Sequence, residues 1–233
     1  MANIMFGVAV AAASGSVGGT TFSRGAGGAI MRNRSRPINP RSSLQNTRRA
    51  NMAYLTKYWS GTLTEQQRSD WRAYAAGTSW TNKLGQSISN SGISAFLRLN
   101  ALRAIMGLAP NAAGPLAMGH AGGITQGFLA ENDTSKLQMD EPGGAFDKDL
   151  DGDYVLWFAG LPVEAGRVTG FKGMRFVGFV EGDSVAAPSF PDEQTAPYTM
   201  AAGQNVTVKA IHIDPESRVS SPVYSTVTAA PSI

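Results

Sequence analysis

The chain of 233 residues contains no cysteine and only two histidines, His120 and His212. The lack of cysteine excludes disulfide scaffolds, thiolate nucleophiles, iron–sulfur clusters and cysteine zinc sites. Two histidines build a metal centre only if carboxylates complete it. These absences remove the usual metalloenzymes and cysteine proteases, and we expect no cofactor. The length still allows a sizeable core, in one large domain or two small ones.

Long hydrophobic runs are also missing. The run from Ile4 to Ala13 is interrupted by Gly7, and it is far shorter than the ~20 residues that span a bilayer. A signal peptide has basic residues before its apolar run, and this run has none before it. We therefore expect a soluble protein that is made in the cytoplasm and has no membrane partner.

Acidic residues are absent from the first 64 positions, which carry eight lysines and arginines. The formal net charge is +8 over residues 1–64, +3 over 65–130 and −8 over 131–233. An uneven distribution of charge along the chain gives information about what the chain associates with, and not about its fold. The sequence therefore predicts separate segments with separate partners.

Residues 1–46 combine glycine, arginine and proline without a helical or strand period. A segment of this composition buries too little apolar surface to offset its backbone entropy. Each proline also pushes the residue before it out of the α region, which favours an extended arm lying on another molecule. The residues expected to contact that partner are Arg24, Arg32, Arg34, Arg36, Pro37, Ile38, Pro40 and Arg41.

Residues 47–109 have a helical pattern. The apolar spacing predicts helices over 47–59, 64–77 and 93–105. The second begins with a capping box, Thr64-Glu-Gln-Gln67, in which two side chains satisfy free backbone N–H groups. These helices predict a small bundle, with a core that includes Trp59, Trp71, Tyr74 and Phe96.

Residues 110–123 are rich in alanine, glycine and proline and are predicted to form a linker. Over 124–233 the period drops to two. Strands are expected at 154–158, 174–180, 206–213 and 222–228, with shorter ones near 124–129 and 137–140. Their spacing is typical of an antiparallel β-sandwich of roughly seven strands, like an immunoglobulin or fibronectin type III module. The whole chain is then an α+β protein with an arm, a helical bundle and a sandwich.

An acid-rich loop is the sharpest local motif. Asp147, Asp149, Asp151 and Asp153 alternate as they do at the opening of a calcium loop. The glutamate expected at the twelfth position is replaced by Phe158. Aspartates in turns also bond to the nearby backbone. We favour a solvated turn and retain a weak Ca²⁺ site as the alternative.

Neither histidine has a serine, aspartate or glutamate at the spacing of a catalytic triad. The glycine-rich stretch 14–20 lacks the Gly-Lys-Ser/Thr ending of a phosphate-binding loop. We therefore expect no enzymatic activity.

Three stretches carry a resemblance. They are Gly18-Gly-Thr-Thr-Phe-Ser-Arg24, Arg32-Asn-Arg-Ser-Arg-Pro-Ile-Asn-Pro-Arg41, and Trp59-Ser-Gly-Thr-Leu-Thr-Glu-Gln-Gln-Arg68 followed by Trp71 and Tyr74. Together, over about residues 18–75, they resemble small structural proteins of tailed bacteriophages and prophages. The resemblance implies a virion component assembled in the host cytoplasm, with a variable C-terminal module.

The residues and the resemblance lead to one main hypothesis and two alternatives. The main hypothesis is a capsid cement or decoration protein whose arm binds the major capsid or other virion subunits, as a homo-oligomer or on a symmetric lattice. The first alternative is a head–tail connector or tail protein, with the same arm in a ring of few copies. The second is a nucleic-acid-binding protein that uses the same arginines on phosphates.

Overall fold

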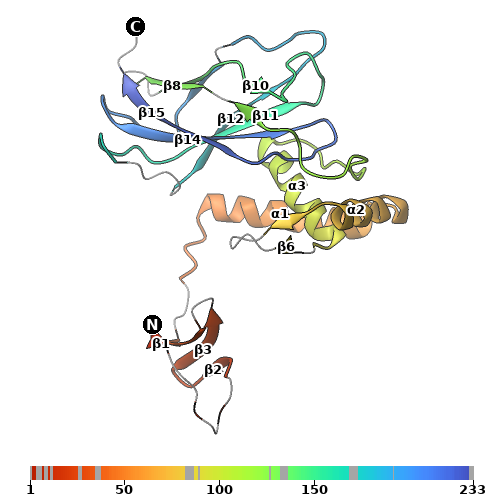
Figure 1. Cartoon of the computed structure of the whole chain (residues 1–233), viewed down its shortest axis with the longest axis vertical. Coiled ribbons are helices and arrows are strands. Elements are labelled where there is room, and N and C mark those ends of the chain that lie inside the picture. Colours follow the sequence, from red (N-terminus) through yellow and green to blue (C-terminus); the bar gives the residue numbers. More distant parts are fainter. Residues whose placement is uncertain are drawn as a thin grey trace. The chain divides into compact units, whose positions relative to one another are not determined.

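The computed structural model describes residues 2–3, 7, 10, 13–25, 28–34, 38–81, 87–88, 90–125, 127–131, 136–167, 173–190 and 192–230. The chain divides into two compact units, Met1–Asn46 and Thr47–Ile233 (Figure 1). The first is small and contains four strands and the first four residues of a helix. The second contains most of the helical residues and the large sheet, so the acidic strands and the aromatic helices share one folded body.

The N-terminal unit is an antiparallel sheet in the order β1-β4-β3-β2. Its strands are β1 (Ala2–Asn3), β2 (Gly15–Val17), β3 (Thr20–Gly25) and β4 (Gly28–Asn33). A two-residue turn at Gly18 and Gly19 joins β2 to β3, and Gly18 has φ of 59°. The prediction that residues 1–46 have no strand pattern is therefore wrong for β1, β2, β3 and β4, and Gly18 and Gly19 serve a hairpin. Residues 38–42 form neither helix nor strand.

Three helices follow, as the sequence predicts. They are α1 (Ser43–Gly61), α2 (Glu65–Gly77) and α3 (Gly92–Met106), and a short strand pair, β5 (Trp80–Thr81) and β6 (Ser87–Ile88), lies between α2 and α3. The predicted capping box is confirmed: the Thr64 hydroxyl accepts from the Gln67 N–H, and the Gln67 carboxamide oxygen accepts from the Thr64 N–H. The first helix begins four residues earlier than predicted, at Ser43 rather than Thr47.

The helices enclose an aromatic core. Trp71, Tyr74 and Phe96 have no exposed surface, and Trp59 packs partly buried against them. The Trp71 and Phe96 rings meet edge to face with centroids 5.4 Å apart, the arrangement that aromatic quadrupoles favour. Leu55 is the one residue of α1 whose side chain is buried.

The large sheet has seven strands in the order β12-β11-β14-β15-β8-β9-β13. Its strands are β8 (Phe128–Glu131), β9 (Lys136–Met139), β11 (Tyr154–Ala159), β12 (Arg175–Glu181), β13 (Asp192–Thr195), β14 (Asn205–Ile213) and β15 (Val223–Ala230). Neighbours pair antiparallel except β15 with β8. A separate pair joins β7 (Ile124–Thr125) to β10 (Gly143–Gly144). The strands predicted at 154–158, 174–180, 206–213, 222–228 and 137–140 are present. The strand predicted near 124–129 is divided between β7 and β8, and β10 and β13 were not predicted.

The sheet curves so that its end strands approach each other. A Cβ on Gly178 of β12 would lie 3.1 Å from the Gln194 side chain of β13. The concave side encloses an apolar core that includes Val155, Trp157 and Val208. The other side of β11 packs against α3, which lies beside it in Figure 1. Every residue of β11 is therefore buried.

Candidate functional site

The predicted contact residues of the N-terminal unit are exposed wherever their side chains are described. Arg32 lies in β4, Arg34 follows the last residue of that strand, and Ile38 is 92% exposed. Arg24 lies in β3, and Arg41 has φ of 49°. Arg36 and Pro37 lie outside the described residues. Pro40 is exposed in the segment before α1. None of the described residues of this set lines the pocket found in the described part of the chain.

The acidic loop forms a hydrogen-bonded turn. Asp147 Oδ1 accepts from the Asp149 N–H at 3.0 Å, and Asp151 Oδ1 accepts from the Ser184 N–H at 2.6 Å. Asp153 Oδ2 accepts from the Asp147 N–H at 2.9 Å. The carboxylates bond to separate backbone groups, the behaviour expected of aspartates in turns. Within the described part of the chain, no group of three or more His, Asp or Glu side chains lies close enough to hold a metal ion.

Asp153 turns inward and meets His212 of β14. Both side chains are 2% exposed, and His212 Nε2 lies 2.5 Å from Asp153 Oδ1. His212 Nδ1 lies 2.9 Å from the Gly122 carbonyl oxygen, which only accepts, so Nδ1 carries a proton. A second proton on Nε2 makes an imidazolium that faces a carboxylate. One proton therefore lies between Nε2 and Asp153 Oδ1, and with that proton on Nε2 the contact is a buried imidazolium–carboxylate pair.

The electrostatics of this pair have opposing causes. Burial lowers the pKa of His212, but its hydrogen bonds to Asp153 and to the Gly122 carbonyl, with the Asp153 charge, leave that pKa raised overall. Asp214, at the end of β14, adds negative charge nearby. The rings of Phe146 and His212 are nearly perpendicular, with centroids 6.5 Å apart. The imidazolium is thus favoured by its partners against the cost of burial.

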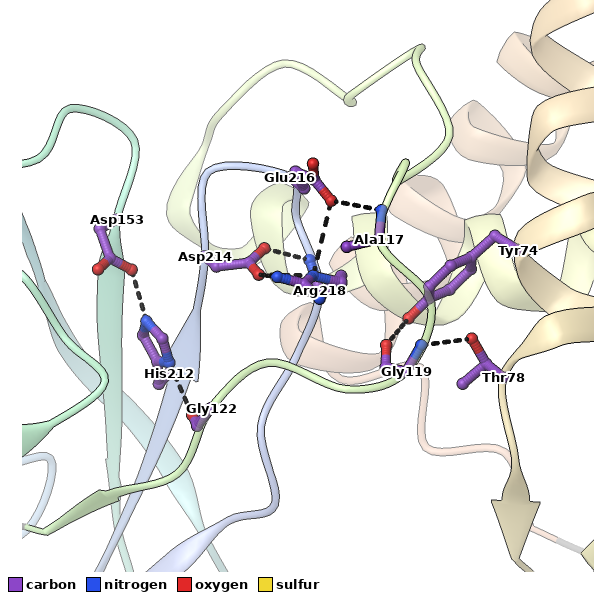
Figure 2. A network of polar contacts seen from close by, with 10 residues as sticks. All are labelled: Tyr74, Thr78, Ala117, Gly119, Gly122, Asp153, His212, Asp214, Glu216 and Arg218. Atoms are coloured by element: carbon purple, nitrogen blue, oxygen red, sulfur yellow. Dashed lines mark hydrogen bonds and ion pairs between the residues drawn. The ribbon is translucent and has the colours of Figure 1, made fainter.

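Residues 110–123 form no helix or strand, yet polar contacts hold them on both sides (Figure 2). On the helical side, the Tyr74 hydroxyl donates to the Gly119 carbonyl at 2.8 Å, and the Gly119 N–H donates to the Thr78 hydroxyl. On the sheet side, the Gly122 carbonyl faces His212. Side-chain burial raises the pKa of Tyr74, so its hydroxyl stays protonated as a donor. The segment is fastened in place rather than free.

The turn after β14 provides further contacts. Asp214 Oδ2 lies 2.7 Å from Arg218 Nη2, and Asp214 Oδ1 accepts from the Arg218 N–H at 2.8 Å. Burial raises the pKa of Asp214 even though the hydrogen bonds and charge of Arg218 act in the opposite direction. Glu216 accepts from the Ala117 N–H at 3.1 Å. This turn therefore holds the middle of segment 110–123.

The pairing of His212 with Asp153 was not predicted from the sequence, in which His212 is an isolated strand residue. Antiparallel pairing of β11 with β14 sets Val155 opposite His212. Asp153 lies two residues from Val155 and so shares its face. Only the register of β11 against β14 indicates that these two side chains meet, and that register cannot be recognised from either residue alone.

No described helix is long and apolar enough to span a membrane. No protein-family model, curated protein or solved structure matches this chain.

Proposed function

We propose that the chain is a structural protein of a tailed-bacteriophage particle, a capsid cement or decoration protein that attaches through residues 1–46. The observation that carries the proposal is the exposure of the N-terminal unit. It has five arginines and no acidic residue, and none of its described side chains is buried. A small sheet whose described side chains are all exposed or half-buried gains stability when it packs on something else.

The surface of this unit is apolar as well as basic. Val17 is 74% exposed, Met31 37% and Ile38 92%. The register sets Phe22 opposite Met31, and Val17 opposite Thr20. Val17, Phe22 and Met31 therefore share one face of the sheet. The register sets Arg32 opposite Thr21, on the other face of the sheet. The unit therefore offers apolar and basic surfaces together, which suits an acidic protein surface with apolar hollows, such as the outer face of a shell subunit.

The C-terminal strands support a display module of the immunoglobulin or fibronectin type III kind. The order β12-β11-β14-β15 corresponds to C′-C-F-G in such sandwiches, and β8-β9-β13 corresponds to A-B-E. In this proposal the module faces away from the shell and carries the acidic excess of residues 131–233.

The test is recruitment of the full chain to purified particles that lack it. We expect Arg32→Glu combined with Arg34→Glu to lower occupancy strongly, because it reverses two charges in the proposed contact. The matched control reverses Arg167 and Arg175, which are exposed residues of the second unit. Full recruitment of the first variant would contradict the proposal. Hundreds of copies per particle indicate cement, and about a dozen or fewer indicate a connector or tail ring.

The five N-terminal arginines also fit a second function, contact with nucleic-acid phosphates. That function predicts DNA binding that weakens steeply with salt and is lost in the Arg32→Glu, Arg34→Glu variant. A native chain that gives no salt-sensitive shift with DNA excludes it.

A further inference from the structure

A small pocket opens in the second unit between the helices and the strands. Its volume is about 160 Å³. Trp80, Leu99 and Val219 provide apolar walls, and Arg98, His120 and Ser221 provide polar ones. These residues come from β5, α3, segment 110–123 and the stretch before β15. No carboxylate lines the pocket among the described residues.

Arg98 supplies the charge. Its guanidinium carbon lies 4.9 Å from the centre of the Trp80 ring, a cation–π distance. Within the described residues, no carboxylate forms an ion pair with Arg98. The guanidinium therefore keeps its planar set of donors for another group, and that set matches a carboxylate in two-point geometry.

The aromatic walls are held by their own hydrogen bonds. Trp80 is 2% exposed, and its Nε1–H donates to the Ala75 carbonyl at 3.3 Å. His120 Nε2 lies 3.1 Å from the Ser79 carbonyl oxygen, and its ring meets Trp80 edge to face at 5.2 Å. A ligand would thus enter a preformed site and order few groups on binding.

We propose that this pocket binds a small free carboxylate that carries a ring or a short apolar group. A cavity of roughly 150 Å³ accommodates benzene, so the volume of about 160 Å³ fits a ligand of that size. The apolar part would pack on Trp80, Leu99 and Val219, with the carboxylate on Arg98. The proposal does not depend on a role in a virus particle.

Benzoate is the probe, and its neutral isostere benzamide is the control. We expect benzoate, titrated into the full-length native chain, to shift the indole N–H signal of Trp80 in a saturable way. Benzamide should bind about tenfold more weakly or worse, because a hydrogen bond to a charged group contributes roughly 1.5–3 kcal/mol. Equal binding of the two compounds, or no binding of benzoate, overturns the proposal without any variant.

Two arginine variants locate the site. Arg98→Gln should weaken benzoate about tenfold. Arg175→Gln should leave it unchanged, since Arg175 also stacks on an aromatic ring, that of Tyr198, with 4.6 Å from its guanidinium carbon to the ring centre. Equal loss in both variants would show that benzoate responds to net charge alone and would also overturn the proposal. If Arg98→Gln fails to fold, the comparison of benzoate with benzamide on the native chain still tests the proposal.

Discussion

The two units of this chain differ in how they obtain stability. Unit Met1–Asn46 has hairpins, five arginines and no buried side chain among those described. Unit Thr47–Ile233 has aromatic and aliphatic cores and a buried ion pair. The same chain thus joins a part that is stabilised by its own interior to a part whose described apolar side chains are exposed or half-buried. Hydrophobic burial is the main stabilising term in folding, so the outward-facing part gains most from a partner surface.

Truncation of a buried core side chain should give the largest difference in stability loss between the two units. Trp71 has no exposed surface, and its Nε1–H donates to the Ala112 carbonyl at 3.1 Å. We expect Trp71→Ala to lower the free energy of unfolding by about 3–5 kcal/mol, the usual cost of removing a buried tryptophan. Chemical denaturation followed by far-ultraviolet circular dichroism measures this loss.

Phe22→Ala in β3 is the matched change in the N-terminal unit. Phe22 is only half-buried, so we expect a loss below about 1 kcal/mol. If Phe22→Ala proved as costly as Trp71→Ala, the N-terminal unit would possess a core of its own and the contrast would fail.

The Asp153–His212 pair should make the second unit sensitive to pH. The folded-state pKa of His212 is raised, so the stabilisation is fully present below the unfolded histidine value of about 6.5 and is lost as pH rises through the folded pKa. Asp153→Asn should cost about 1–3 kcal/mol at pH 6, because it leaves a buried group poorly partnered, and should flatten the dependence. Unfolding curves between pH 5.5 and 9 measure both effects.

Asp183→Asn is the control for that series. Asp183 is an exposed carboxylate that accepts from the Val185 and Ala186 N–H groups. Hydrogen bonds from these two groups lower its pKa, so it stays ionised across the range and its replacement should leave the slope unchanged. A native slope that survives Asp153→Asn would show that another group titrates.

Local signals predicted the elements that depend on neighbouring residues. The capping box at Thr64 and the stop at Gly107, which has φ of 80°, locate the start of α2 and the end of α3. The strongly alternating or apolar stretches became β11 and β14. These features follow from chain geometry within a few residues.

Long-range features could not be predicted in the same way. The pairing of Asp153 with His212 joins positions 59 residues apart, and it depends on how β11 and β14 align. In the N-terminal unit, glycine content predicts only an entropic cost, whereas Gly18 and Gly19 form the loop between the paired residues Val17 and Thr20. Arg32, Arg34 and Arg41, the described arginines of this unit after β3, form no ion pair with a described carboxylate. In the proposed function their role depends on a molecule outside the chain.

One substitution can be made identically in both units. A Cβ on Gly92 would lie 2.9 Å from the Arg72 backbone nitrogen, where α2 and α3 pack closely. Gly92→Ala should therefore destabilise the second unit by about 1–3 kcal/mol. A Cβ on Gly19 would have no other atom within 4 Å, so Gly19→Ala should change stability by less than about 1 kcal/mol. Thermal unfolding measures the stability of both variants. Equal stability losses would contradict the expected difference between the two units.

The smallest effects on stability are expected at two highly exposed side chains, only one of which lies in the proposed contact. Ile38 is 92% exposed in the N-terminal unit, and Val185 is 93% exposed in the second. Ile38→Ala and Val185→Ala should each alter the free energy of unfolding by less than about 0.5 kcal/mol, since neither side chain packs on its own fold. Particle occupancy should nevertheless fall for Ile38→Ala alone, because only that side chain lies in the proposed contact. Equal occupancy of both variants would mean that Ile38 is merely solvated, and the attachment would then rest on the arginines.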